Sequence, residues 1–407
     1  MSDQDINETI KQFTKIRIKN SKRPKSISFK KFRGKRPDWN VFPDTQEPFF
    51  QDSKEVALYS KNKLFTGENR WNESKVPVLN DDIAQLAEKT KILDCKPLIK
   101  PYMEHDLFKD YNGTIPLMSE DELNTPGPCF EYISDWEAKY LQDNKKYGQN
   151  YKYVIISARH HINNLAITLF DVKRPINFKL NCILLKGKYI VLSMDEKSKG
   201  NNMDLSKLSL TDKKRCNSGF AFEHLLTGTK AGDNSEPVFS IIENVFNSDV
   251  LLLLRSEMDA YNNKTKSYSE LKCYGPLSMG NTYHRLKLLK TWVQTQLVPD
   301  CDVIIGTRQN YGGLLTDIQE FTREQFYKKL NIRDSALSRN FNLTVARAWT
   351  RHCIESIVKL VDLSVDKNEE YVIKPQPFQL SIDDMRNISI KKLDHIPTNI
   401  DIPKQYL

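Results

Sequence analysis

Two short charged segments, one on each side of a turn, constrain the fold more than any other feature of this sequence. The first, at 257–259, reads Glu-Met-Asp and ends an apolar stretch. The second, at 270–272, reads Glu-Leu-Lys and follows after ten residues. Alternate residues of a β-strand share a face, so each segment would place two charged side chains together and one apolar side chain opposite them. The turn-like residues at 262–266 predict that the two segments form a hairpin.

The register of this hairpin decides whether its charges meet. A hairpin centred on the turn places Asp259 opposite Glu270 and Glu257 opposite Lys272, all on one face, whereas a slip of one residue would separate the pairs. Three clustered carboxylates repel one another unless a cation compensates them. Oxygen ligands select Mg²⁺ or Mn²⁺, which can activate water against a phosphoryl group, and a nearby lysine can stabilise the transition state. The alternative is an ordinary exposed hairpin with alternating charges.

A helix predicted at 219–226 could bring a fourth carboxylate to this cluster. Phe222, Leu225 and Leu226 have the i, i+3, i+4 spacing of an apolar helix face, and Glu223 falls beside that face. The alternative is a solvated helix glutamate.

A second predicted helix, at 283–297, has a polar stripe suited to phosphate and base contacts. Lys287, Lys290 and Gln294 recur at helical spacing, while Leu289 and its apolar neighbours face inward. Solvated lysine faces with no ligand are the alternative, and they are common on helices.

An arginine follows the strand predicted at 153–156. Arg159 could pair with a carboxylate or with a phosphate. On an extended chain the next two residues, His160 and His161, would face opposite ways, which argues against a metal site built from this pair.

The order of the predicted elements favours a single α+β domain at 37–407. Strand composition recurs at 153–156, 165–169, 189–194, 238–242 and 303–306, and helical patterns recur at 283–297, 322–330 and 343–363. The seven cysteines contain no CxxC pair, which excludes a zinc ribbon or a thioredoxin-type site. The longest aliphatic run, at 250–254, is far too short to span a membrane.

The net charge of +9 belongs to the N-terminal segment, not to the domain. Residues 11–36 carry twelve lysines and arginines and no acid, and residues 1–10 carry three acids. The rest of the chain, 37–407, therefore has 49 bases and 49 acids and no net charge. Like-charged runs repel themselves, so we expect 1–36 to be a disordered tail. It could tether the chain to RNA, act as a nuclear import signal, or merely keep the protein soluble.

Five of these motifs, in this order, resemble the DXO (Dom3Z-like) family of decapping and 5′–3′ exoribonucleases, in its budding-yeast branch. The matching positions are Arg159, Gly219 to Glu223, Glu257 with Asp259, Glu270 with Lys272, and Trp292 with Gln294. The resemblance implies two largely antiparallel β-sheets flanked by helices around a PD-(D/E)xK-like nuclease core. The family commonly has glycine after the arginine of the first motif, and His160 departs from that pattern at the 5′-end pocket.

The resemblance also implies a set of ligands. Glu223, Asp259, Glu270 and the main-chain carbonyl of Leu271 would bind one Mg²⁺ or Mn²⁺ ion, and Glu257 would help to bind a second. The groups implied or suited to contact RNA 5′-end phosphates are Arg159, Lys272, Lys290 and Gln294.

The implied activity is hydrolysis of the first phosphodiester of RNA with an incomplete or NAD cap, which releases the cap plus a nucleotide, and stepwise digestion from a 5′-monophosphate. We expect a monomer that acts inside the cell, in the cytoplasm, with nuclear entry possible through the basic tail. Two alternatives stay open: a DNA nuclease with the same core, and a catalytically idle RNA-binding partner that activates another exonuclease.

Overall fold

The computed structural model describes most of the chain. The described residues are 14–17, 25–29, 49–88, 92–118, 122, 125–170, 178–195, 205–229, 237–330, 343–365, 374–383, 386–398 and 400–407.

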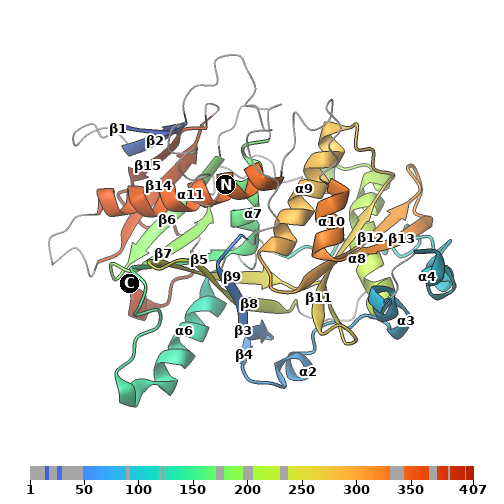
Figure 1. The fold of residues 1–407 in the computed structure, drawn as a ribbon, viewed down its shortest axis with the longest axis horizontal. Coiled ribbons are helices and arrows are strands. Elements are labelled where there is room, and N and C mark those ends of the chain that lie inside the picture. The colour runs from blue at the N-terminus through green and yellow to red at the C-terminus, as the bar shows by residue number, and fades with distance from the viewer. Residues whose placement is uncertain are drawn as a thin grey trace.

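The strands form two sheets (Figure 1). In spatial order the larger sheet contains β1 (Thr14–Arg17), β2 (Lys25–Phe29), β15 (Ile388–Lys392), β14 (Gln376–Ile382), β6 (Phe178–Leu185), β7 (Tyr189–Met194), β5 (Tyr153–Ala158), β9 (Val250–Glu257), β8 (Phe239–Asn247), β3 (Asp52–Ser60) and β4 (Lys63–Phe65). The smaller sheet has the order β10 (Ala260–Asn262), β11 (Ser267–Tyr274), β12 (Cys301–Arg308) and β13 (Leu315–Phe321). Most pairs are antiparallel, whereas β5 runs parallel to both β7 and β9, and β11 runs parallel to β12.

Helices cover both sheets. The α-helices are α2 (Arg70–Ser74), α3 (Asp81–Ala84), α4 (Ile92–Ile99), α6 (Gly127–Lys139), α7 (Arg159–Ile167), α8 (Leu210–Thr227), α9 (Thr282–Gln296), α10 (Arg323–Leu330) and α11 (Leu343–Ser364). Short 3-10 helices lie at Gln85–Glu88, Lys100–Tyr102, Leu141–Asp143, Leu205–Lys207 and Lys404–Tyr406. In Figure 1, α7, α9, α10 and α11 lie on one side of the larger sheet and α6 lies on the other.

The central strand β9 is apolar along almost its whole length because both of its faces are covered. Leu252 and Leu254 pack in the cluster that contains α7, α9 and α11. Leu251 and Leu253 point the other way, into the cluster that contains α6. The period-two alternation of a strand therefore divides one leucine run between two cores.

The smaller sheet lies between α8 and the pair α9–α10. Leu271 and Ile304 pack with Phe222 of α8. Val303, the residue before Ile304 on β12, points to the other face of the sheet, into the core formed by α9 and α10. A Cβ added to Gly306 of β12 would lie 2.5 Å from a ring atom of Phe222, so α8 approaches the sheet closely at this point. Glu223, the next residue, is thereby brought to the edge of the sheet.

The α+β class and the two largely antiparallel sheets flanked by helices are confirmed. The strands predicted at 153–156, 189–194, 238–242 and 303–306 and the helices predicted at 283–297, 322–330 and 343–363 are present, with ends displaced by a few residues.

The strand predicted at 165–169 is wrong. These residues lie at the end of α7 and just beyond it, because Ile162, Leu165 and Ala166 have helical spacing and bury one helix face in the core. The helix predicted at 219–226 is the second half of α8, which begins much earlier and is capped by the Ser209 side chain accepting from the Asp212 amide.

The basic segment 1–36 lies mostly outside the described residues. Within it the structure describes the backbone of β1 and β2, which pair with each other, and β2 pairs with β15. Disorder of the segment stays a prediction. None of the helices that the structure describes is both long and apolar enough to cross a membrane.

Candidate active site

The acidic cluster lies where the chain crosses from the larger sheet to the smaller one. Strand β9 ends at Glu257, and β10 begins at Ala260. Strand β10 pairs with β11 only as far as Ser269, and beyond that point no strand among the described residues pairs with this edge of β11. The backbone N–H of Leu271 on this free edge donates to Asp259 Oδ2 at 2.8 Å.

The predicted long hairpin is wrong, although its register is correct where the strands pair. Ala260 lies opposite Ser269, which continues to Asp259 opposite Glu270 as expected. Glu257, however, pairs with Phe239 of β8 in the larger sheet and not with Lys272. Alternation along the sequence gave the faces of the strands but could not show that the first strand belongs to another sheet.

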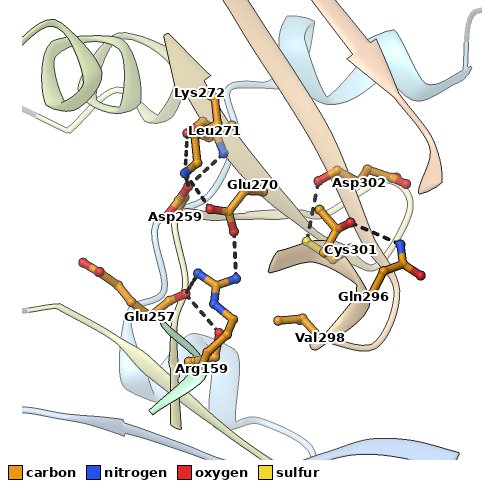
Figure 2. Close-up of polar contacts among 12 residues, drawn as sticks. Arg159, Glu257, Asp259, Glu270, Leu271, Lys272, Gln296, Val298, Cys301 and Asp302 are labelled. Atoms are coloured by element: carbon orange, nitrogen blue, oxygen red, sulfur yellow. Dashed lines mark hydrogen bonds and ion pairs between the residues drawn. The ribbon is translucent and has the colours of Figure 1, made fainter. Parts of the chain in front are cut away.

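The Lys272 ammonium group lies among three of the predicted metal ligands. Its Nζ is 2.5 Å from Glu270 Oε1, 3.1 Å from Asp259 Oδ2 and 3.0 Å from the Leu271 carbonyl oxygen (Figure 2). These three oxygens, two from carboxylates and one from the backbone, thus converge on one positively charged group. The ammonium group marks the position that is most favourable for a cation.

Arg159 joins the two sheets at the site. The strand β5 ends at Ala158, and the guanidinium of the next residue, only 6 % exposed, donates through NH1 to Glu270 Oε2 at 2.8 Å. Its NH2 donates to the Glu257 carbonyl at 3.1 Å, as Figure 2 shows. The predicted carboxylate partner is therefore present, and Arg159 holds β11 of the smaller sheet against the end of β9. Phosphate contact by Arg159 stays a prediction.

The electrostatics of the carboxylates differ sharply within the cluster. Burial alone would raise the pKa of Glu270, but the charges of Arg159 and Lys272 outweigh it and lower that pKa to about 2. Desolvation by the surrounding protein and then the charge of Asp259 raise the pKa of Glu257 to about 7. Desolvation also raises the pKa of Asp259, with Glu270 as the next cause.

Glu223 of α8 belongs to the same cluster. Desolvation raises the pKa of its carboxyl well above the usual value, and the charge of Asp259 is the next largest cause. The predicted fourth carboxylate therefore lies close enough to interact electrostatically with Asp259 and Lys272.

The charges of this cluster do not balance. Four carboxylates, on Glu223, Glu257, Asp259 and Glu270, face the two cations of Arg159 and Lys272, which leaves two negative charges when all groups are ionised. No three acidic, histidine or cysteine side chains among the described residues are already arranged as ligands around one point. The Lys272 ammonium group accounts for this, since it lies between Asp259 and Glu270. The donors themselves are hard oxygen ligands with an excess charge of −2, which fits a hard divalent cation.

The polar stripe of α9 is only partly brought to the site. Lys290 is exposed, and desolvation together with the positive charge of Lys272 lowers its pKa, so the two lysines are near each other. Gln294 is half-buried, and its side chain makes no hydrogen bond with the carboxylates of the described cluster.

The two histidines beside Arg159 are on a helix, not on a strand as expected. Their rings are 4.1 Å apart in α7, and His161 is completely buried, with Nδ1 3.2 Å from Ser157 Oγ. Burial followed by the charges of Arg255 and Lys290 lowers the pKa of His160 to about 3. His160 is therefore uncharged at neutral pH.

A pocket at Arg255, on the strand that ends at Glu257, was not predicted. It has a volume of about 750 Å³ and is lined by residues from β3, the start of α6, β8 and β9. Arg255 lines it and lies over the ring of Phe239 at 4.3 Å, and Phe239 is the strand partner of Glu257. No local sequence pattern predicts it, because the lining residues come from segments that are far apart in the chain.

Comparison with known proteins identifies the family of this fold and site. A family model described as RAI1 like PD-(D/E)XK nuclease matches residues 102–406. The chain belongs to this nuclease family. It is therefore a hydrolase, and the resemblance seen in the sequence is confirmed.

Relatives from yeasts extend the match beyond the family model. "Decapping and exoribonuclease protein 1" of Saccharomyces cerevisiae is 34 % identical over 373 residues, which cover 89 % of this chain and 82 % of that protein. The crystal structure of Kluyveromyces lactis Dxo1 in complex with manganese has a TM-score of 0.64 at 23 % identity and covers 89 % of this chain and 96 % of its own. Scheffersomyces stipitis Rai1 in complex with (3′-NADP)⁺ and calcium has a TM-score of 0.60 at 20 % identity and covers 86 % of this chain and 91 % of its own.

Proposed function

We propose that this protein is a divalent-cation-dependent RNA 5′-end nuclease. It removes incomplete (unmethylated) or NAD caps by hydrolysing the first phosphodiester, releases the cap plus a nucleotide, and degrades 5′-monophosphate RNA from 5′ to 3′. The observation that carries the proposal is the convergence of Asp259, Glu270 and the Leu271 carbonyl on one cationic group. The name of the Saccharomyces relative, and the manganese and dinucleotide in the related structures, support it.

Glu223, Asp259, Glu270 and the Leu271 carbonyl would hold one Mg²⁺ or Mn²⁺ ion, and Glu257 would contribute to a second. A bound divalent cation supplies an activated water and neutralises charge on the phosphoryl group. Lys272 contributes a positive charge at the same point, where it can stabilise the negative charge that develops on the phosphate. Arg159 holds the Glu270 carboxylate of β11 beside the Glu257 backbone at the end of β9, and so keeps the proposed ligands of the two strands near each other.

Action at an RNA end is supported by the pocket that Arg255 lines, two residues before Glu257 on β9. Its volume of about 750 Å³ is in the range that holds a small ligand such as a cap nucleotide. All the proposed ligands come from one chain, so we propose that the monomer is active. Action inside the cell, in the cytoplasm or also in the nucleus through the basic segment 1–36, stays a prediction.

One assay tests the function. RNAs with an unmethylated cap, an NAD cap, a triphosphate or a monophosphate at the 5′ end, and a 5′-phosphorylated DNA, are incubated with Mn²⁺ or with EDTA. We expect Mn²⁺-dependent release of cap plus nucleotide and of mononucleotides from RNA, and no reaction in EDTA or after Asp259→Ala or Glu270→Ala. The triphosphate RNA tests whether His160, which stands where the family commonly has glycine, affects the cleavage of triphosphate ends.

Three outcomes of this assay would contradict the proposal. Undiminished cleavage by both variants would place the chemistry elsewhere. Preferential cleavage of the DNA would make the chain a DNA nuclease. Binding of RNA without cleavage of any substrate would make it the idle RNA-binding partner.

A further inference from the structure

A row of alternating lysine and tyrosine side chains leads from the acidic cluster to the surface. Lys272 interacts electrostatically with Tyr274, two residues further along the same face of β11. Lys287 of α9 has its Nζ 5.7 Å from the centre of the Tyr274 ring and 4.7 Å from that of Tyr283. The Tyr283 residue is 58 % exposed. We call Lys272, Tyr274, Lys287 and Tyr283 the Lys–Tyr row.

The position of the row follows from the strand and helix patterns. Residues 270, 272 and 274 share the face of β11 that is turned toward α9, and the Tyr274 hydroxyl lies 2.9 Å from Thr291 Oγ1 of that helix. Lys287 is one helical turn before Thr291, and Tyr283 is a further turn toward the N-terminus. The row therefore continues from the end of a strand in the site along one side of a helix to solvent.

Of the two lysines in the row, Lys272 pairs with carboxylates of the cluster, and Lys287 has no acidic partner among the described residues. Lys287 contacts the two tyrosine rings and makes no ion pair with any carboxylate of the described residues. Helix α9 contains Lys287, Lys290 and Arg285 but no aspartate or glutamate. Beyond the cluster, an anionic ligand would therefore meet the positive charge of Lys287, which no ion pair among the described residues compensates.

Aromatic rings alternating with basic side chains are the features by which proteins bind single-stranded nucleic acid, since bases stack on the rings and phosphates contact the cations. An isolated tyrosine with a lysine over its ring is weak evidence by itself. Tyr140, directly after α6, is such a case, with Lys145 Nζ 5.2 Å from its ring centre. The Lys–Tyr row differs because it is continuous with the acidic cluster.

We propose that the single-stranded RNA downstream of the cleaved bond lies along the Lys–Tyr row, with a base stacked on Tyr283 and a phosphate beside Lys287. This inference rests on the proposed function and adds to it the residues that hold the body of the RNA rather than its 5′ end. It accounts for the exposed tyrosine ring at the end of a charged path that begins at Lys272.

The test measures binding without cleavage. A fluorescent single-stranded RNA of about twelve nucleotides with a 5′-monophosphate is titrated with the full-length protein in EDTA, and its anisotropy is followed. We expect Tyr283→Ala to weaken binding about tenfold, and Tyr283→Phe, which keeps the stacking ring, to bind like the wild type. Lys287→Ala should weaken binding and reduce the slope of log affinity against log salt by about 0.7. The loss should be smaller for a dinucleotide, which lacks most of the downstream RNA.

Tyr140→Ala is the matched control, and it should bind RNA like the wild type. Equal losses for Tyr140→Ala and Tyr283→Ala, no loss in either, or no measurable binding of the RNA by the wild type would overturn the proposal. The two proposals fail separately. If RNA binding depends on the row but no RNA is cleaved in Mn²⁺, the proposed function is wrong and the proposal for the row holds. If RNA is cleaved but the variants bind it as well as the wild type does, the proposal for the row is wrong and the proposed function holds.

Discussion

Two clusters of charged residues join the two sheets of this protein, and they differ in how their charges are balanced. In the first, Glu55 of β3 accepts from Arg70 at 2.8 Å, from Ser240 at 2.8 Å and from the hydroxyl of Tyr268 on β11. In the acidic cluster, four carboxylates share two cations. The Glu55 network is complete within the protein, whereas the acidic cluster has two excess negative charges when all of its groups are ionised, and a divalent cation would balance them. We infer that the first serves stability and the second serves chemistry.

The largest expected effect is a loss of activity from a substitution in the acidic cluster. Asp259→Asn keeps an oxygen that can accept from the Leu271 amide but removes a charge and a ligand. We expect kcat/KM on 5′-monophosphate RNA to fall by a factor on the order of 10²–10³, with no loss of thermal stability because a like-charge repulsion is relieved. Asp249→Asn, an exposed change at the opposite end of β9, is the control and should keep full activity. Retained activity in Asp259→Asn would remove the distinction.

The second prediction concerns the Glu55 network and measures stability instead of activity. Glu55→Gln breaks a buried ion pair whose side chains are 5 % and 17 % exposed. We expect it to lower the free energy of unfolding by about 3 kcal/mol, measured by urea denaturation, because Arg70 is left without a charged partner. Glu68→Gln, at an exposed position near Arg70, should change stability by less than about 0.5 kcal/mol. A fully stable Glu55→Gln protein would show that the network is dispensable.

The third prediction concerns the binding of a divalent cation by the acidic cluster. Mn²⁺ at about a hundred times its dissociation constant should stabilise the wild type by about 2.7 kcal/mol, since only the folded state brings the ligands together. Asp259→Asn should lose most of this increment, and Glu55→Gln should keep it. Parallel denaturation curves with Mn²⁺ and with EDTA measure the difference. An equal increment in both variants would contradict the assignment of the two clusters.

The smallest expected effect comes from a carboxylate outside both clusters. Both oxygens of Glu320 are buried without a hydrogen-bond partner among the described residues, and burial followed by the charge of Asp302 raises the pKa of Glu320 to about 8. The folded state therefore holds a proton that the unfolded chain loses above about pH 4, so its contribution is present at low pH and is lost as the pH rises through 8.

Glu320→Gln should therefore gain about 1 kcal/mol of stability relative to the wild type between pH 5 and pH 8.5. Exposed Glu324→Gln, which loses only a surface ion pair, is the control. A difference between the wild type and Glu320→Gln that does not change with pH would show that this carboxyl is ionised throughout.

The sequence allowed the clustering of the carboxylates to be predicted better than the path of the chain between them. Period-two alternation placed Glu257 with Asp259 and Glu270 with Lys272, and the order of five motifs pointed to the nuclease family, which the comparisons confirm. Alternation gives the face of a residue but not its partner strand, so the departure of β9 into the larger sheet could not be predicted.

Arg159 shows a further limit of prediction from sequence. Its pairing with a carboxylate was foreseen as one of two possibilities, but its bridge between Glu270 and the Glu257 carbonyl depends on α7 beginning directly after β5. The pocket at Arg255 and the Lys–Tyr row depend on contacts between elements far apart in the chain, which no local pattern contains.

The most direct test of the central claim is anomalous diffraction at the manganese edge from crystals grown in Mn²⁺. The account predicts a peak within ligand distance of the Asp259 and Glu270 carboxylates and the Leu271 carbonyl, with the Lys272 ammonium group moved aside. A protein that degrades RNA in the same buffer, but whose map has its manganese elsewhere or none at all, would contradict the claim that this cluster is the catalytic centre.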